Sequence, residues 1–416
     1  MKRSSVCFSV LCVLTLISTT TTTFAESQTQ VATDSLPAAP KTLVFSSYLV
    51  PGDFINIYAA VRSPNNSFII GGSGSVDGGA FYESNLHTGA FFTSDAANPN
   101  FVSALTVSSG LQVIAAGGNP LQDLGTGIPS CVQGFGLDPW IDAGSYRTCI
   151  PGLVIAPSAI AVDSANSVYV ASGPTIVKIS STPALVYTFT LGGSATNITG
   201  LAVNSQGQVY VVGNAGKDLP TKNALQPTGN GAFLAKLDAA GTADLFATYL
   251  NGKFGGTTAA AIAINPSGVY VTGYVGTTAA PTVYVSKVLT SGKKLVYRKA
   301  IGPGLPSAIV VDAKNQTYVT GQTTSAAFPL VRAFQIAHAS GFVASVNTPG
   351  KAILWSSYLG GTSFDQMSGI GVNSDGTIWV GGTATSYDFP VTDGSICDGG
   401  GTGFCQAGFV TKISAN

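Results

Sequence analysis

Charged residues are scarce in this chain: they make up 9% of its 416 residues, and the formal net charge is +0. Proteins that bind nucleic acids or anionic lipid surfaces carry clustered Lys and Arg that neutralise phosphates. The 19 Lys and Arg of this sequence are too few, and too evenly matched by 19 Asp and Glu, to build a strong basic patch. We therefore expect no nucleic-acid partner.

Histidine is almost absent, since the chain contains only His87 and His338. Two histidines, in a sequence that has no Cys-x-x-Cys pair, are too few to complete a zinc or copper site. Calcium needs about six to eight oxygen ligands, and no turn in the sequence gathers several carboxylates. We expect no metal and no other cofactor.

Long apolar runs are also missing, apart from one near the N-terminus. That run, residues 6–17, spans about a dozen residues, which is too short for a bilayer core of about 30 Å. It follows Lys2 and Arg3 and precedes a Thr-Phe-Ala sequence ending at Ala25, the layout of a secretory signal peptide. We expect cleavage of residues 1–25 and a mature protein that is secreted, periplasmic or at the cell surface, without a membrane span.

Four cysteines remain after this cleavage, namely Cys131, Cys149, Cys397 and Cys405. An even number of cysteines in an exported chain is typical of disulfides. The pairs that are close in sequence, Cys131 with Cys149 and Cys397 with Cys405, are the expected partners. Four cysteines allow about three connectivities, and geometry decides among them.

Glycine, in contrast, is abundant at 51 residues, which favours an all-β protein with many tight turns. The stretch VNSQGQVYVVG, residues 203–213, has a near copy in VNSDGTIWVGG, residues 372–382. The first halves of seven such copies, 41 to 61 residues apart, end at Val61, Val107, Val162, Val203, Ile264, Val311 and Val372. A period near 50 with alternating apolar residues is typical of β-propeller blades.

Each copy predicts a hairpin of strands a and b, and in five of the seven copies the turn begins with an Asx residue, whose side chain accepts backbone hydrogen bonds; Arg62 and Ser108 break this pattern in the first two. These turn residues are Asp163, Asn204, Asn265, Asp312 and Asn373. A large residue on strand b should pack between sheets, and a glycine three positions later should allow close backbone approach. The large residues are Phe68, Ile114, Tyr169, Tyr210, Tyr270, Tyr318 and Trp379.

A second hairpin, strands c and d, follows in most copies, as in AFLAKL and LFATYL within residues 232–250. At the chain ends, LVFSSYL (residues 43–49) has the pattern of a strand d, and GFVTKI (residues 408–413) that of a strand c. We expect these two strands to pair and close the ring. The prediction is a short linker, residues 26–42, and one domain, residues 43–416, that forms a seven-bladed β-propeller of four-stranded antiparallel blades.

The chain resembles SBBP-type β-propeller repeats, a bacterial repeat related in layout to NHL-type propellers. The resemblance is strong over residues 158–416 and weak over residues 43–150. Residues 119–150 depart from the strand c and d pattern. The resemblance implies an architecture found in exported proteins and no single activity. It is carried by ATYLNG (residues 247–252), residues 356–391, residues 218–243 and AFPLVRAFQ (residues 327–335).

Several connections between strands b and c are long, and functional sites of repeat proteins usually lie in such elaborated loops. We expect a ligand on the face formed by the b–c and d–a loops or at the mouth of the central channel. Within these loops DLP, AFP and DFP recur, with Pro220, Pro329 and Pro390. They could form a ligand cradle, but recurrence in equivalent blades favours packing, with Leu or Phe between blades and Pro fixing the loop.

The sequence favours a non-catalytic, monomeric scaffold that binds a protein or a cell-surface glycan through the b–c loop face. Aromatic and acidic loop residues can stack on sugars or anchor a protein. The alternative is a hydrolase or lyase that acts on polysaccharide with carboxylates at the channel mouth, but the spacing of Asp218, Asp365, Asp388 and Asp393 selects no pair. The candidate ligand-binding residues are Trp140, Tyr387, Asp388, Asp393 and Asp218.

Overall fold

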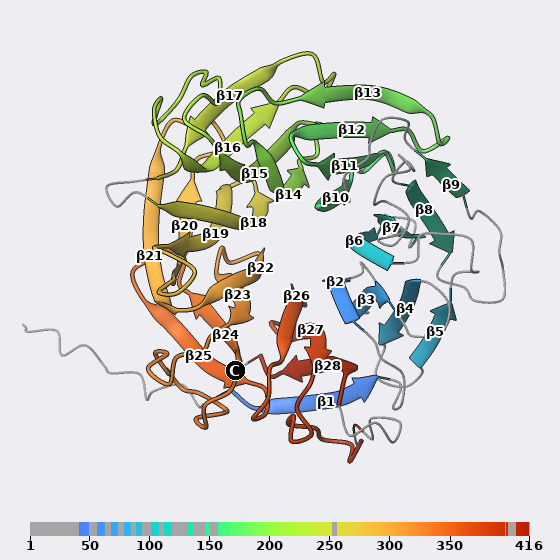
Figure 1. Ribbon diagram of the computed structural model, residues 1–416, viewed down its shortest axis with the longest axis vertical. Coiled ribbons are helices and arrows are strands. Elements are labelled where there is room, and N and C mark those ends of the chain that lie inside the picture. Colours follow the sequence, from blue (N-terminus) through green and yellow to red (C-terminus); the bar gives the residue numbers. More distant parts are fainter. Residues whose placement is uncertain are drawn as a thin grey trace, which may run out of the picture. The chain divides into compact units, whose positions relative to one another are not determined.

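The chain divides into two units, Met1–Ala38 and Ala39–Asn416, and the computed structural model describes parts of the second one (Figure 1). The described residues are 41–49, 56–62, 68–73, 79–84, 89–93, 101–107, 112–118, 131–136, 146–149, 157–251, 256–395, 397 and 405–415. The predicted signal peptide and most of the predicted linker lie outside these residues.

The described residues form β-strands and no helix, which confirms the all-β prediction. The strands pair into four-stranded antiparallel sheets, and each sheet contains consecutive strands, apart from the sheet that combines the first strand with the last three. In Figure 1 the first strand of a sheet, such as β14 or β18, lies innermost and the fourth, such as β17 or β21, lies outermost. Within the described residues, no helix is long and apolar enough to cross a membrane.

The strand bounds follow the chain order. One sheet contains β2 (Asn56–Arg62), β3 (Phe68–Ser73), β4 (Gly79–Ser84) and β5 (Gly89–Thr93). The next contains β6 (Phe101–Val107), β7 (Gln112–Gly118), β8 (Cys131–Gly136) and β9 (Tyr146–Cys149). It is followed by β10 (Ala159–Val162), β11 (Val168–Ser172), β12 (Thr175–Ile179) and β13 (Leu185–Thr190).

The second half of the chain repeats this arrangement. One sheet contains β14 (Asn197–Val203), β15 (Val209–Ala215), β16 (Gly231–Leu237) and β17 (Asp244–Tyr249). Another contains β18 (Thr257–Asn265), β19 (Gly268–Val275), β20 (Thr282–Val288) and β21 (Leu295–Pro303). The next sheet contains β22 (Leu305–Val311), β23 (Thr317–Gln322), β24 (Gly341–Val346) and β25 (Ile353–Leu359). The last sheet contains β26 (Gln366–Val372), β27 (Ile378–Ala384) and β28 (Ala407–Ile413), together with β1 (Leu43–Leu49).

The second repeat corrects one expectation. Residues 119–150 depart from the strand c and d pattern in sequence, yet β8 and β9 form the third and fourth strands of the sheet that begins with β6. The backbone register places Cys131 opposite Cys149 on these two strands. The departure therefore lies in side-chain identity and not in the strand content of the sheet.

The turns between the first two strands form as the Asx residues predict. Asp163 Oδ1 accepts hydrogen bonds from the backbone N–H groups of Ala165 and Ser167, and Asn204 Oδ1 does the same for Gln206 and Gln208. The large residues on the second strands are buried, as expected: Tyr169, Tyr210, Tyr270, Tyr318 and Trp379. Short turns and buried rings thus repeat with the same spacing from sheet to sheet.

A glycine follows four of these five rings and meets the neighbouring strand closely, whereas Ser172 follows Tyr169. A Cβ atom at Gly213 would lie 2.1 Å from the carbonyl oxygen of Asn197 on β14. The register of β14 and β15 shifts at this point, between Ile198 and Gly200, which brings the backbones together. Only glycine leaves room for this local irregularity.

Neighbouring sheets contact each other through a glycine that stacks on a ring. The turn between β20 and β21 contains Gly292 in the left-handed region, at a φ of 74°, and a Cβ there would lie 2.7 Å from the ring of Phe246 on β17. Gly350, in the turn between β24 and β25, makes the same contact with Tyr297 on β21. Because a side chain at these turns would displace the ring, the glycines allow one sheet to lie against the outer strand of the previous sheet.

The sheet that contains both chain ends has no such turn, because the chain ends replace it. β1 pairs antiparallel with β28, and Ser46 Oγ lies 2.8 Å from Thr411 Oγ1 on the opposite strand. Lys41 Nζ lies 5.7 Å from the ring centre of Trp355 on β25 and donates a hydrogen bond of 2.9 Å to the carbonyl oxygen of Ser414. A lysine at one chain end therefore contacts both the other end and the ring of the neighbouring sheet.

The buried position of Lys41 predicts a specific pH dependence of stability. Burial, aided by the charge of Arg332, lowers the pKa of Lys41 from 10.5 to about 8. Between these two pH values the unfolded chain binds more protons than the folded one, so the contribution of Lys41 to the free energy of unfolding increases as the pH rises. In urea unfolding at pH 7 to about 10.5, we expect the wild type to gain stability relative to Lys41→Met. Lys217→Met, which changes an exposed lysine, is the control and should show no such pH dependence relative to the wild type. If the difference in free energy of unfolding between the wild type and Lys41→Met does not change with pH, the lowered pKa of Lys41 is wrong.

Candidate functional site

Three loops between the second and third strands run back along the outer edge of their own sheets. We call these segments straps; they comprise residues 220–226, 329–335 and 390–395. In the first, Lys222 and Ala247 on β17 exchange two backbone hydrogen bonds, of 3.0 and 2.9 Å. Val331 pairs with Ser356 on β25, and Thr392 N donates a hydrogen bond of 2.8 Å to the carbonyl oxygen of Ser46 on β1. The straps thus cover backbone groups that an outer strand would otherwise expose.

An apolar side chain anchors each strap. Leu219, Phe328 and Phe389 are all buried, and each directly precedes the proline that begins its strap. The hydroxyl of Tyr358 on β25 donates a hydrogen bond of 2.8 Å to the carbonyl oxygen of Ser325, and Tyr249 and Tyr48 bond the equivalent loop carbonyls. The packing interpretation of the recurring Leu-Pro and Phe-Pro pairs is confirmed. Phe389 is therefore closed to a ligand, because only 3% of its surface is accessible.

Two of the predicted ligand-binding residues hold a neighbouring loop in place. Asp218 accepts hydrogen bonds of 2.8 Å from both the backbone N–H and the hydroxyl of Ser194, and these bonds lower the pKa of its carboxyl. Asp388 bonds Thr362 in the same way, at 2.8 and 3.0 Å. In each case the partner lies in the loop that leads into the first strand of the same sheet. Both carboxylates are exposed, so a ligand could still reach them.

The other predicted residues are only partly brought together. Tyr387 is 56% exposed and precedes Asp388, while Asp393 Oδ1 accepts a hydrogen bond of 3.0 Å from the N–H of Ser395 in the same loop. Asp218 belongs to the loop of a different sheet, between β15 and β16. Trp140 lies outside the described residues. Tyr387, Asp388 and Asp393 therefore share one loop, between β27 and β28, to which Asp218 does not belong.

A buried carboxylate lies beside this group. Asp365 is 0% exposed, and its oxygens accept hydrogen bonds of 2.8 Å from Gly361 N and 2.8 Å from the hydroxyl of Ser386. The backbone N–H groups of Thr385 and Ser386 provide two more, at 2.9 and 3.1 Å. Burial raises the pKa of Asp365, and these hydrogen bonds oppose the rise. Because donors surround both oxygens, this carboxylate joins two loops and does not reach a substrate.

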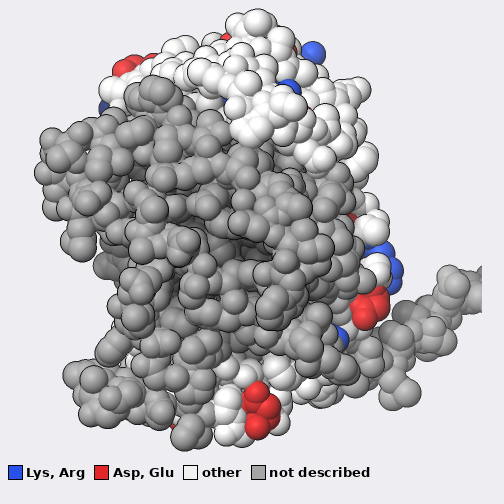
Figure 2. Space-filling model, turned by 90° about the vertical axis from the view of Figure 1, so that its right-hand side faces the viewer, with Lys and Arg blue, Asp and Glu red and all other residues white. Residues whose placement is uncertain are grey.

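A cysteine pair completes this face of the sheets. Cys397 and Cys405 form a disulfide within the loop that contains the third strap, as expected. Figure 2 shows another side of the molecule, the one on which β4, β5, β8 and β9 lie in Figure 1; the few described charged side chains visible there include both signs. Among the described residues, no group of three or more His, Cys, Asp or Glu could hold a metal ion.

A repeated cation–aromatic contact lies inside the sheets. A lysine on the third strand lies directly opposite the buried ring of the second strand, as Lys236 does for Tyr210. The distances from Nζ to the ring centres are 4.9 Å for Lys178 over Tyr169, 4.8 Å for Lys236 over Tyr210, 5.1 Å for Lys287 over Tyr270 and 5.2 Å for Lys412 over Trp379. Such contacts stabilise a lysine that is partly removed from water.

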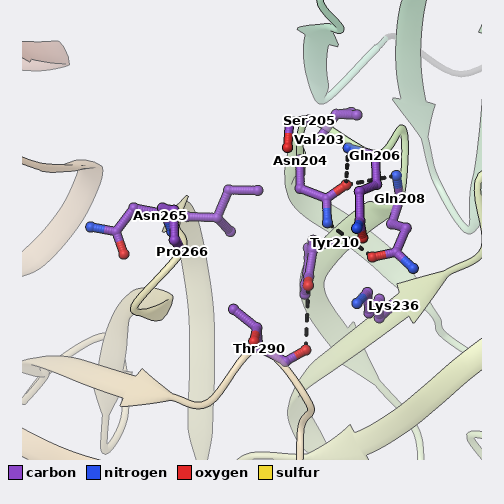
Figure 3. A pocket seen from close by; sticks show the side chains of 11 residues that line it. Val203, Asn204, Ser205, Gln206, Gln208, Tyr210, Lys236, Asn265, Pro266 and Thr290 are labelled. Carbon is purple, nitrogen blue, oxygen red and sulfur yellow. Dashed lines mark hydrogen bonds between the residues drawn. The ribbon is translucent and has the colours of Figure 1, made fainter.

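A cavity of about 540 Å³ opens beside one of these lysines, between the sheet of β14 to β17 and the sheet of β18 to β21. Tyr210, Lys236 and Gln208 line one side of it, and Asn265 and Pro266 line the other (Figure 3). The cavity lies at the ends of the sheets where the first and second strands turn. This is the opposite end from the long loops, where we expected a ligand.

A second cavity, of about 500 Å³, does lie among the long loops. It is lined by residues of the β19–β20 and β23–β24 connections, together with Gly304 and the exposed Phe364. None of the predicted site residues that the structure describes lines either cavity. The sequence contained one signal for the first cavity that we did not use, namely the lysine that recurs opposite four of the five described rings.

Comparison with known proteins bears on the fold. No protein-family model matches the chain, and no curated protein matches it. Among solved structures, it is similar to the WD40 β-propeller domain of Doa1, with a TM-score of 0.58 at 9% identity over 91% of this chain and 98% of that one. The WD40 repeats of RRP9 match with a TM-score of 0.59 at 10% identity, over 90% of this chain and 99% of that one.

A third similar structure is U3-55K, with a TM-score of 0.58 at 9% identity over 89% of this chain and 99% of that one. At such identities, the similarity concerns the fold alone. Together with the four-stranded antiparallel sheets, it shows that the chain is a β-propeller repeat protein. The resemblance to SBBP-type repeats stays a prediction.

The hydrogen bonds of Asp365 predict that even an isosteric substitution destabilises the fold. In Asp365→Asn, one oxygen becomes an NH₂ group that faces N–H or O–H donors in either orientation of the amide. We expect the free energy of unfolding, measured in urea, to fall by about 2–3 kcal/mol, because a buried donor loses its acceptor. The exposed Asp218→Asn is the control and should cause a smaller loss. Equal losses in the two variants would contradict this role of Asp365.

Proposed function

We propose that this protein is an exported, non-catalytic seven-bladed β-propeller that serves as a scaffold for protein interactions. The observation that carries the proposal is the similarity to WD40 propellers over about nine-tenths of the chain. Propellers of this kind present rigid loops on a closed scaffold, and binding residues on repeat proteins usually lie in such loops. The monomeric state and the export of residues 26–416 belong to the same proposal.

Contacts between the innermost strands support seven blades in a closed ring. β2 contacts β6, β6 contacts β10, and the series continues through β14, β18 and β22 to β26, which contacts β2 again. The pairing of β1 with β28 supports closure within the last blade. A ring closed in this way has no open edge between its first and last blades.

The cysteines support an oxidising compartment. The disulfide of Cys397 and Cys405 fixes a loop beside the exposed Tyr387, and the register of Cys131 and Cys149 is compatible with a second disulfide. Disulfides persist in exported proteins and are rare in the cytosol. We propose that the partner binds the loop face through Tyr387, Asp388 and Asp393, with Trp140 and Asp218 as further candidates.

The test uses residues 26–416 with disulfides formed and immobilised on a biosensor. Proteins captured from a surface extract of the source organism are identified, purified and measured for binding one at a time. We expect a partner whose affinity falls at least tenfold in Tyr387→Ala, because exposed aromatic residues often anchor interfaces. Leu185→Ala, which alters an exposed apolar side chain on β13, is the control and should leave the affinity unchanged.

A glycan array and an assay for released reducing ends run in parallel. Binding of a glycan but of no protein would replace the protein partner with a lectin-like function. Release of reducing ends that is lost in Asp388→Asn would overturn the non-catalytic assignment. If neither proteins nor glycans are retained, the scaffold proposal is wrong.

A further inference from the structure

The repeated cation–aromatic contact differs between blades in one respect, which is the partner of the lysine charge. In the sheet of β10 to β13, Lys178 Nζ lies 3.6 Å from Asp163 Oδ2, the carboxylate that begins the turn between the first two strands. In the sheet of β18 to β21, Lys287 Nζ donates a hydrogen bond of 2.7 Å to the hydroxyl of Ser267. Each of these two lysines therefore has a polar partner within its own blade.

Lys236 has no such partner. The residue that corresponds to Asp163 is Asn204, at the same spacing from the buried tyrosine. The side chain of Asn204 makes the same turn, with hydrogen bonds of 3.0 and 2.9 Å from the N–H groups of Gln206 and Gln208, but it supplies no charge. Among the described residues, Lys236 forms no ion pair and donates no hydrogen bond. Lys236 therefore has the contact with the ring, but neither the carboxylate that Lys178 has nor the hydroxyl that Lys287 has.

The cavity next to Lys236 has the chemistry of a site for an anion. Its described lining residues include no Asp or Glu. Gln208 Oε1 accepts a hydrogen bond of 2.9 Å from the side-chain amide of Asn204, which leaves the NH₂ group of Gln208 as a donor on the same side of the cavity as Lys236 (Figure 3). The volume of about 540 Å³ falls within the range of about 300–1,000 Å³ that ligand sites occupy.

We infer that this cavity binds the carboxylate of an acidic segment in a protein partner. The carboxylate pairs with Lys236 Nζ and accepts a hydrogen bond from Gln208, in place of the aspartate that the neighbouring blade supplies. A single lysine with a neutral amide suits a singly charged group, whereas phosphate sites usually add arginine or clustered backbone N–H groups. The inference rests on the proposed scaffold function and adds a second contact region at the opposite ends of the sheets.

An acidic sugar fits this cavity less well than a protein side chain. Sugars are commonly held by stacking on an exposed aromatic ring. Tyr210 is the aromatic residue of the lining, but it is 2% exposed and Lys236 covers its ring. The ring is therefore closed to a sugar, while the ammonium group and the amide remain available to a carboxylate.

The test is an NMR titration of the full mature chain with the peptide acetyl-(Glu)₆-amide, following the backbone amides of residues 204–210. We expect saturable shifts in the wild type and none with acetyl-(Gln)₆-amide. Asn204→Asp should weaken binding at least tenfold, because the new carboxylate would pair with Lys236 as Asp163 pairs with Lys178 in the neighbouring blade. Since Asp163 and Asp312 form the same turn, this variant keeps the fold. Lys236→Met should weaken binding equally, and Lys287→Met, in the neighbouring blade, should not.

Several results would overturn the inference. These are the absence of shifts with the glutamate peptide, or binding that is unchanged in Asn204→Asp and Lys236→Met. Shifts with the acidic sugar trigalacturonate, but not with the glutamate peptide, would overturn the choice of a protein segment as the ligand. If a partner captured by the scaffold assay binds wild type and Asn204→Asp equally, the carboxylate site is wrong and the scaffold stands. If the peptide binds as expected but no protein partner is found, the scaffold function fails and the carboxylate site remains.

Discussion

The outer edge of each sheet is the constraint on which much of this structure depends. The fourth strand has no neighbour on its outer side, and unpaired backbone groups there would pair with other chains. In three sheets the chain meets this constraint with a strap, and the strap dictates the rest of its loop: a proline to begin it, a buried Leu or Phe before the proline and a tyrosine on the outer strand to bond it. The length of these loops is thus explained by edge protection before any ligand is considered.

Between the sheets, the same positions carry different chemistry in different blades. The buried ring and the turn are nearly constant, whereas the charge around them varies. One blade holds both Asp163 and Lys178, another holds Lys236 opposite Tyr210 but Asn204 in the turn, and the blade of Asp312 has Ser345 where the lysine would be. A repeat fold tolerates such exchanges because each position is supported by its own blade. Differences between equivalent positions are therefore where a function specific to this protein can be found.

The sequence alone predicted the strands well, because alternation and Asx turns are local properties. The strand predicted at residues 43–49 agrees with β1 at both ends, and the strand predicted at residues 408–413 agrees with β28 to within one residue. The candidate site was predicted less well. Asp218 and Asp388 are acidic, exposed and in long loops, yet the hydrogen bonds to Ser194 and Thr362 depend on contacts between loops far apart in sequence. The cavity beside Lys236 arises between two sheets, so no single stretch of sequence describes it.

The contact of Lys41 with Ser414 has a consequence for how the protein is made. β1 leaves the ribosome first, and its partner β28 leaves last, so the first strand waits for nearly the whole chain before it can pair. Long-range pairings of this kind form slowly, and an unpaired strand is exposed to wrong partners in the meantime. Chaperones would then act on a molecule in which the earlier sheets can form while the last sheet is still incomplete. The pairing of β1 with β28 is thus the last step of folding as well as the contact that joins the two ends of the chain.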